Sequence, residues 1–314
     1  PELIDEITSI NEWPSVYLAN YADEFLKLPA EVLIASMQGH QKCLPVYNRH
    51  HQLLAHFIGV SNIESQDMAS VIRGNEKVMR ARLSDAAFFY QQDRSKPLSY
   101  YADLTETVIF EKRLGSLADK TKRVQVIARH LAKIVGLESS DVNRAVSLSK
   151  ADLMTGLVNE FPELQGLIGQ YYAIADGEKE GLAKALFEQY LPRFSGDELP
   201  QTDLGLVLSL AERLDTLVGI FAIGLKPTGE KDPYKLRRHA LAIVRLILQK
   251  PNQLSLSELI AVAAKNYDFL SISDTLLEEI KQFILERMQS LFQQLHFAPE
   301  SIQAALKVES DVLY

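Results

Sequence analysis

The stretch TDLGLVLSLAERLDTLVGIFAIG, residues 202–224, is the longest apolar run of the chain and decides its fold. Its apolar side chains recur at steps of three and four, which is the spacing of one helix face. Asp215 falls on that same face. A carboxylate in an apolar core must be paired, hydrogen bonded, protonated or bound to a metal, because an isolated buried charge costs several kcal/mol or more. The run therefore predicts a core helix that is also a candidate site.

Composition places the chain among ordinary globular proteins. Its 314 residues are enough for about two domains of ~150 residues each, and the formal net charge is −8. Such an acidic balance argues against a surface coated with basic residues, although a local basic face remains possible. The single cysteine, Cys43, cannot form an internal disulfide, so we expect a reducing, cytoplasmic compartment. Charges at Glu212, Arg213 and Asp215 interrupt the apolar run and exclude a membrane span there.

The first part of the chain predicts a small α+β region over residues 1–98. Short β-prone runs at 31–37, 43–47 and 53–60 are separated by polar breaks, which is typical of a small mixed sheet. Residues 74–93 follow with apolar side chains at helical spacing. We therefore expect a long helix that ends near Asp93.

From residue 100 onward the pattern becomes helical. A helix over residues 120–135 should stop at Gly136, and another over 141–160 carries Asp152 inside its apolar stripe. The core helix follows, and then a helix over 234–249 and further helices. The predicted fold is mainly α. Its parts are the α+β region, a helical domain over 99–224, and further helices with a linker over 225–314.

Two inward-facing aspartates suggest a metal site in the helical domain. Asp152 and Asp215 could hold a divalent ion for phosphoester hydrolysis if histidines joined them. This helical order resembles the HD-type phosphohydrolase domain, whose metal ligands are a histidine, a His-Asp dipeptide and a later aspartate. Ala151 stands where the dipeptide's histidine should be, and Lys120 and Thr121 stand where the first ligand should be. We therefore expect no bound metal.

The alternative role for Asp152 and Asp215 is structural. Each could cap a neighbouring helix or pair with a buried cation, because a charge-assisted hydrogen bond offsets the cost of burial. The candidate cations are Lys150, Arg213, Arg237 and Arg238.

A local basic excess lies between residues 73 and 123, where eleven Lys and Arg stand against seven Asp and Glu. Arg73, Lys77 and Arg80 fall along one side of the long helix, with Arg82 turned away. Such a face can bind the phosphate backbone of a nucleic acid. The alternative is a solvated face with intrahelical ion pairs such as Glu76 to Arg80.

Long strings of the sequence resemble one protein family. The chain is similar, in the same order from residue 3 almost to its end, to the beta subunit of bacterial glycyl-tRNA synthetase. The strings that carry the resemblance are MQGHQKCLPVYN, IRGNEKVMRARLSDAAFFYQQDR, FEKRLGSLADKTKRV, LSKADLMTGLVNEFPELQGLIGQYYA, QYLPRFSGDELP, LAERLDTLVGIFAIG and KPTGEKDPYKLRRHAL.

The resemblance implies membership of a ligase of two alpha and two beta subunits. In that family the catalytic core, with ATP and magnesium, lies on the alpha subunit, whereas the beta subunit recognises tRNA(Gly) and supports assembly. The chain would be the central part of a longer beta subunit, comprising the end of an editing-domain-like module, a degenerate HD-type domain and a linker. Asp152 and Asp215 would then be structural relics, and no catalytic residue is expected here.

Two other functions remain open at this point. One is an HD-type metal-dependent phosphohydrolase, and the other is a helical protein-interaction scaffold without RNA contact. The sequence contains no P-loop, no G-x-S-x-G elbow and no G-x-G-x-x-G after a strand. Nucleotide or nucleophilic chemistry in this chain is therefore not expected.

Overall fold

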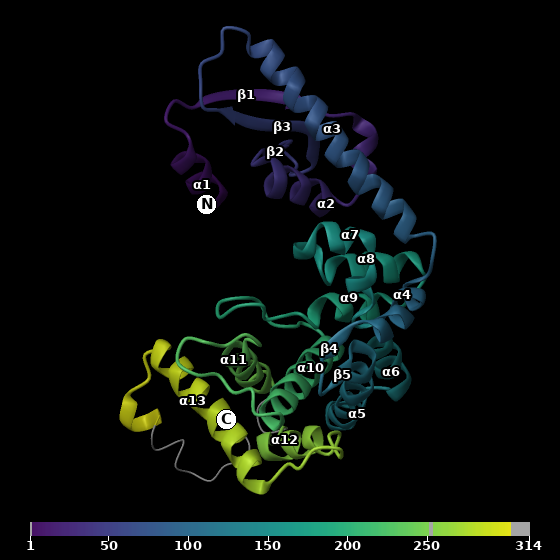
Figure 1. Ribbon diagram of the computed structural model, residues 1–314, viewed down its shortest axis with the longest axis vertical. Helices are drawn as coiled ribbons and strands as arrows, with labels where there is room; N and C mark the ends of the chain where they lie inside the picture. The colour runs from purple at the N-terminus through teal and green to yellow at the C-terminus, as the bar shows by residue number, and fades with distance from the viewer. Residues whose placement is uncertain (1, 251–253, 303–314) are drawn as a thin grey trace. The chain divides into compact units, whose positions relative to one another are not determined.

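The computed structural model describes residues 2–250 and 254–302 (Figure 1). It is mainly helical with a small sheet near the N-terminus, which confirms the prediction of a mainly α fold; the HD-type character of the helical domain stays a prediction. The chain divides into two compact units. We call Pro1–Lys96 with Thr155–Gln165 the sheet module, and Pro97–Met154 with Gly166–Tyr314 the helical module. The finer predicted boundaries at residues 98 and 224 stay predictions.

The sheet module contains one antiparallel sheet and the longest helix of the described chain. Its elements are α1 (Glu2–Ile10), β1 (Ser15–Asn20), η1 (Asp23–Lys27), α2 (Ala30–Ala35), the π-helix η2 (Ser36–His40), β2 (Leu44–Tyr47), β3 (Leu53–Ser61), α3 (Met68–Asp93), α7 (Gly156–Glu160) and η5 (Pro162–Leu164). The strand order is β1-β3-β2, with both pairs antiparallel.

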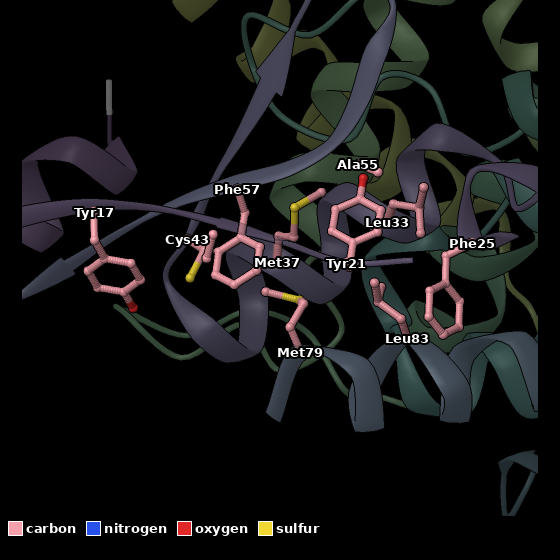
Figure 2. Packing of buried hydrophobic residues seen from close by; sticks show 11 residues of the cluster. Tyr17, Tyr21, Phe25, Leu33, Met37, Cys43, Ala55, Phe57, Met79 and Leu83 are labelled. Carbon is pink, nitrogen blue, oxygen red and sulfur yellow. The ribbon is translucent and has the colours of Figure 1, made fainter. Parts of the chain in front are cut away.

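One face of this sheet forms the core of the module. In β1, Tyr17 and Ala19 are buried, whereas Val16 and Leu18 on the opposite face are exposed, as the two-residue period of a strand requires. The buried face packs with α2, η2 and one side of α3 (Figure 2). The cluster comprises Tyr17, Ala19, Tyr21, Phe25, Leu33, Met37, Cys43, Ala55, Phe57, Met79 and Leu83.

Three local predictions in this module are corrected. Residues 31–37, predicted as a strand, form α2 and the start of η2, because Leu33 and Met37 are buried one helical turn apart. Residues 15–20 were not predicted and form β1. The long helix begins at Met68 rather than at residue 74, because the side chain of Asp67 accepts a hydrogen bond from the backbone N–H of Ser70 and caps it. The predicted strands at 43–47 and 53–60 are confirmed.

The helical module consists of helices with one very short hairpin. Its elements are α4 (Leu98–Leu104), η3 (Thr105–Thr107), β4 (Ile109–Glu111), β5 (Gly115–Ser116), α5 (Leu117–Val135), α6 (Ser139–Leu148), η4 (Ala151–Met154), α8 (Leu167–Ala175), α9 (Glu180–Glu188), α10 (Asp203–Ala222), α11 (Leu236–Ile247), α12 (Leu256–Ala264) and α13 (Asp274–Gln294). Within the described residues, no helix has both the length and the apolar character needed to cross a membrane.

α5 begins and ends on local signals that the sequence carries. At its start, Ser116 and Asp119 form a capping box, in which each side chain accepts from the other residue's backbone N–H. At its end, Gly136 adopts a left-handed conformation with φ of 82°, which confirms the predicted glycine stop. This helix carries Lys120 and Arg123 toward the centre of the module.

The single helix predicted over residues 141–160 is wrong. α6 ends at Leu148, a 3-10 turn follows, and the chain then enters the sheet module as α7. The carboxylate of Asp93 accepts from the backbone N–H groups of Gly156 and Leu157 at 2.8 and 2.9 Å. In a continuous helix these two N–H groups would bond to backbone carbonyls four residues earlier. They are bonded to a side chain instead, so they belong to the first turn of a new helix.

α10 lies at the centre of the helical module, against α5, α9, α11 and α12 (Figure 1). Thr202 caps its start, and nearly every residue from Gly205 to Phe221 is buried. The prediction of a core helix is confirmed. Burial is not limited to the one apolar face that the sequence predicted. Because neighbours cover all sides, polar residues such as Ser209 and Arg213 are buried too.

Candidate functional site: a buried ion network and a basic helix

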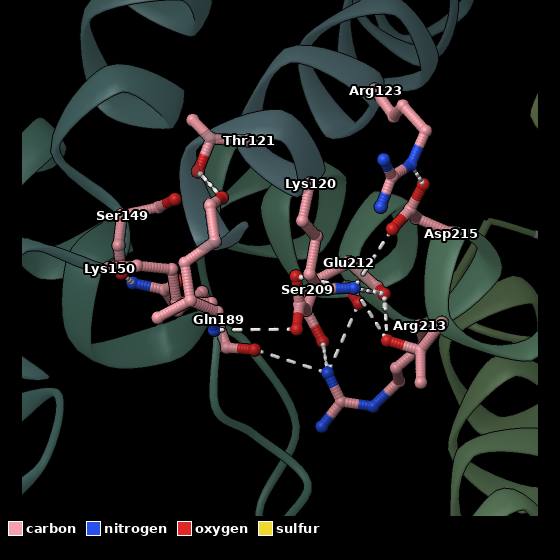
Figure 3. Close-up of polar contacts among 12 residues, drawn as sticks. Lys120, Thr121, Arg123, Ser149, Lys150, Gln189, Ser209, Glu212, Arg213 and Asp215 are labelled. Atoms are coloured by element: carbon pink, nitrogen blue, oxygen red, sulfur yellow. Dashed lines mark hydrogen bonds and ion pairs between the residues drawn. The ribbon is translucent and has the colours of Figure 1, made fainter. Parts of the chain in front are cut away.

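Asp215 lies in the middle of α10 and is completely buried (0% exposed). Arg123 donates from Nε to its Oδ1 at 2.9 Å, and Lys120 donates from Nζ to its Oδ2 at 3.0 Å (Figure 3). The hydroxyl of Tyr267 also donates to Oδ1 at 2.8 Å. Burial alone would lower the pKa of Arg123, but the carboxylate of Asp215 raises it. The carboxylate is therefore fully engaged by two cations and a phenol.

Lys120 is as buried as its partner, at 2% exposed. Besides Asp215, its ammonium group donates to Oγ1 of Thr216 at 2.7 Å and lies 3.4 Å from a carboxylate oxygen of Glu212. The ring of Phe110 lies 4.5 Å from Nζ and adds a cation–π contact. An ammonium group has three N–H donors, and Asp215, Thr216 and Glu212 supply an oxygen for each of them.

Glu212 joins a second lysine to the network. Its Oε1 lies 3.5 Å from Nζ of Lys150, which also sits 4.3 Å from the ring centroid of Tyr190. Burial lowers the pKa of Lys150, although Glu212 opposes that change. For Glu212, burial acts to raise the pKa, but the nearby Lys120 and Lys150 outweigh it and the net pKa is lowered. We call Lys120, Arg123, Lys150, Glu212 and Asp215 the ion network.

Arg213 performs a different task on the same helix. Its guanidinium donates to the backbone carbonyls of Gln189, Tyr190 and Pro192 at 3.1, 3.1 and 2.9 Å. It also donates to the hydroxyl of Ser209 at 2.8 Å. Burial lowers its pKa to about 10. Arg213 therefore stabilises the segment after α9 instead of neutralising an aspartate.

Asp152 belongs to the 3-10 turn η4, not to an α-helix. Its Oδ2 accepts from the backbone N–H of Gly166 at 2.5 Å, and its Oδ1 accepts from the hydroxyl of Tyr190 at 3.1 Å. Burial raises the pKa of Asp152, while Lys150 acts in the opposite direction. Its partners thus include an amide and a phenol, whereas Asp215 is held by cations.

The cation partners of Asp215 differ from the four that the sequence suggested. Lys120 and Arg123 hold it, whereas Lys150 serves Glu212 and Arg213 binds carbonyls. A sequence signal for Lys120 existed. It lies four residues before Val124 and seven before Ile127, within the buried stripe of α5. Tyr267 had no such signal, because it reaches Asp215 from a distant segment.

Gly219 makes the approach of Tyr267 possible. A Cβ at position 219 would collide with the Tyr267 hydroxyl, so only glycine fits one turn beyond Asp215. The same hydroxyl accordingly reaches both the carboxylate and the backbone carbonyl of Asp215.

A divalent metal does not fit this donor set. Both carboxylate oxygens of Asp215 already accept from cationic groups, and Lys120 and Arg123 would repel another positive charge. In the part of the chain that the structure describes, no group of three or more His, Cys, Asp or Glu side chains is placed to hold a metal ion. The arrangement is suited to stabilising a core.

The basic residues predicted on the long helix lie on α3. Arg73, Lys77 and Arg80 are exposed, whereas Arg82 is half-buried. Arg73 donates to the hydroxyl of Ser70 at 2.7 Å. Arg82 lies 3.9 Å from Glu160, a weak ion pair.

Lys77 and Arg80 have no side-chain partner among the described residues. The ion pair expected between Glu76 and Arg80 does not form, because Oε1 of Glu76 accepts from the backbone and side-chain nitrogens of Asn20 at 2.9 and 3.1 Å. Two adjacent cations on one helix face are therefore available to a ligand.

These features define a mainly helical protein with a small antiparallel sheet module, a helical core neutralised by internal ion pairs, and a basic exposed helix. The family model described as glycyl-tRNA synthetase beta subunit matches residues 1–307, and the chain belongs to this family.

Three relatives illustrate the similarity. The chain is 44% identical over 311 residues to the glycine–tRNA ligase beta subunit of Dichelobacter nodosus, covering 99% of the chain and 45% of that protein. It is 45% identical to the corresponding beta subunits of Proteus mirabilis and Glaesserella parasuis serovar 5, covering 97% of the chain and 44% of each. The chain thus spans less than half the length of these relatives.

Proposed function

We propose that this chain is a non-catalytic, tRNA-binding and assembly part of a glycine–tRNA ligase beta subunit. It supports the ATP-dependent attachment of glycine to tRNA(Gly), which the alpha subunit catalyses with ATP and magnesium. Its partners are the alpha subunit and tRNA(Gly), in a cytoplasmic assembly of two alpha and two beta subunits. The family match over residues 1–307 is the observation that carries this proposal.

The charges of α3 support the RNA-binding part of the proposal. Arg73, Lys77 and Arg80 project from one exposed face, and the last two have no partner among the described residues. Free Lys and Arg head groups spaced along a helix can each contact a backbone phosphate. Arg82 is turned away from this face and lies 3.9 Å from Glu160, so its contribution to RNA binding would be the weakest of the four.

The ion network supports the non-catalytic part. In our proposal the helical module is a degenerate HD-type domain, in which Asp152 and Asp215 are retained as structural residues. Lys120 stands where the resemblance places the first metal ligand, and its ammonium group binds Asp215 at 3.0 Å. An ammonium group thus supplies the positive charge that a metal would bring. This geometry disfavours the phosphohydrolase alternative.

The third function, a scaffold without RNA contact, predicts that the α3 cations are unimportant for tRNA. The deciding experiment uses the full beta subunit assembled with its alpha partner and the double variant Lys77→Glu with Arg80→Glu. We expect glycylation of tRNA to show a KM for tRNA raised by about tenfold or more, from two lost charge-assisted contacts. Formation of glycyl adenylate, measured by pyrophosphate exchange, should not change.

A matched control separates this effect from a general change in charge. Lys27→Glu with Arg49→Glu makes the same charge change at two exposed positions of the sheet module outside α3. The control should glycylate like the unaltered enzyme. Equal KM values for the α3 variant and the unaltered enzyme would refute α3 as a tRNA contact, and a loss of adenylate formation in the α3 variant alone would point to an assembly role instead.

A further inference from the structure

A basic pocket of about 370 Å³ lies in the helical module, between the segment after α9, the start of α11 and the second half of α13. Three arginines line it, and no acidic residue does. The other lining groups are a phenylalanine, two serines, a glutamine and two leucines. The residues are Phe194, Ser195, Arg237, Arg238, Leu241, Arg287, Ser290, Leu291 and Gln294.

The arginines of this pocket retain unused donors. Arg238 is exposed and has no side-chain partner among the described residues. Arg287 donates from Nη2 to Glu286 at 2.9 Å, but its Nε is buried and has no hydrogen-bond acceptor there. Arg237 uses Nη2 to bind the carbonyl of Gly229 at 2.6 Å. Guanidinium groups that converge on one cavity with free donors match the tetrahedral oxygens of a phosphate.

The wall that carries Phe194 and Ser195 is firmly held. Arg245 donates to the carbonyls of Phe194 and Asp197 at 3.4 and 2.7 Å. Arg193 pairs with Asp197 at 3.0 Å. Phe194 nevertheless remains 56% exposed. An exposed aromatic ring on an anchored backbone, beside cations, is an arrangement on which nucleic-acid bases stack.

We propose that this pocket binds a phosphate group carried by an RNA strand, with Arg238 and Arg287 as its principal ligands and Phe194 as a surface for an adjacent base. The phosphate chemistry follows from the lining residues, whereas the RNA as its source rests on the proposed function. This site is separate from the face of α3, because every residue that lines it belongs to the helical module.

The test measures two ligands on the 314-residue chain. Binding of tRNA(Gly) is followed by fluorescence anisotropy, and binding of free pyrophosphate by the rise in melting temperature that it causes. The variant Arg238→Glu should weaken tRNA binding by about tenfold or more, since a charge-assisted hydrogen bond is replaced by repulsion. Arg287→Gln should weaken it less, and Arg238→Lys should retain part of the affinity.

The control is Lys265→Glu, which makes the same charge change at an exposed position outside the pocket. Because Arg238 has no intramolecular partner among the described residues, its replacement should leave the melting temperature of the free chain unchanged.

The pocket proposal is wrong if Arg238→Glu and Lys265→Glu bind tRNA equally well and pyrophosphate raises the melting temperature of both variants by the same amount. If only the pyrophosphate effect depends on Arg238, the site binds phosphate but not RNA. A chain that binds no tRNA at all contradicts the proposed function, whereas the pyrophosphate result still decides the pocket.

Discussion

The cations of α5 and those of α3 are the same residue types in opposite surroundings. Lys120 and Arg123 are buried in the helical module, and each meets a carboxylate within 3.0 Å. Lys77 and Arg80 are exposed in the sheet module, without a partner among the described residues. The first pair can act only within the fold, whereas the second is available to a ligand. Burial, not residue type, thus separates a structural cation from a candidate binding cation.

The largest effect should come from breaking the buried pair. Asp215→Ala leaves Lys120 and Arg123 buried without their carboxylate, which should lower the free energy of unfolding by about 3–5 kcal/mol. Urea unfolding of the chain measures this change through the transition midpoint. Asp268→Ala, at an exposed position of the same module, is the control. A midpoint for Asp215→Ala equal to that of the control would contradict the burial described here.

The next largest effect is the pH dependence of stability that His239 causes in the charged core of the helical module. Burial lowers the pKa of His239 to about 3, with Arg213 adding to the shift and Glu212 opposing it; Lys120 and Lys150 also lower it. The imidazole is therefore neutral when folded and takes up a proton below pH ~6.5 when unfolded. This contribution to stability is complete above pH ~6.5 and is lost as the pH falls toward 3.

The measurement is the dependence of unfolding free energy on pH between 4 and 6. His239 should contribute about one proton to it, a slope of ~1.4 kcal/mol per pH unit. His239→Gln should remove this part of the slope. His50→Gln, at an exposed turn of the sheet module, shows what the loss of any imidazole does. If the unfolding free energy of the His239 variant and of the unaltered chain had the same slope against pH, the lowered pKa of His239 would be contradicted.

A smaller effect is expected on tRNA binding when two pairs of cations within α3 are compared. Lys77→Gln with Arg80→Gln should weaken tRNA binding by about tenfold and reduce the salt dependence by about two units of slope, one per lost phosphate contact. Arg73→Gln with Arg82→Gln should weaken it less, because Ser70 and Glu160 already engage these side chains. Titrations at several salt concentrations measure both values. Equal losses in the two double variants would mean that intramolecular partners do not decide which cations bind.

The smallest expected effect is that of divalent metal on the helical module. With Asp215 committed to Lys120 and Arg123, adding or chelating manganese should leave the melting temperature unchanged, and elemental analysis should find no stoichiometric metal. About one manganese, iron or zinc per chain, with phosphatase activity lost in Asp152→Ala, would revive the phosphohydrolase alternative.

Much of the fold could be predicted because its signals are local. The apolar run of α10, the glycine after α5 and the strands β2 and β3 each follow from spacing or a turn residue. The failures have two causes, ambiguous local patterns and contacts with distant segments. Residues 31–37 are too short for periodicity to separate a strand from a helix. The break before α7 has one local signal, the N-cap Thr155, whose side chain accepts from the backbone N–H of Val158. The additional bonds from Asp93 come from a distant segment and could not be read from residues 141–160.

The site was predictable to the same extent. The register of Asp215 in the apolar run correctly predicted its burial. Its partners were not found, because Lys120 was interpreted only as a missing metal ligand, although its own place in the stripe of α5 indicated burial. Tyr267 could not be predicted at all, since it approaches from 52 residues further along the chain. Spacing identifies a buried charge, but only the fold identifies its counterpart.

The return of the chain into the sheet module at residues 155–165 has a consequence for inheritance. Because Asp93 caps α7, the sheet module is completed by a segment that is encoded inside the helical one. A recombination event with one crossover near residue 97 would deliver a sheet module without α7 and leave the carboxylate of Asp93 without the two amides. An exchange of the sheet module between two such proteins would therefore have to carry residues 155–165 along with it.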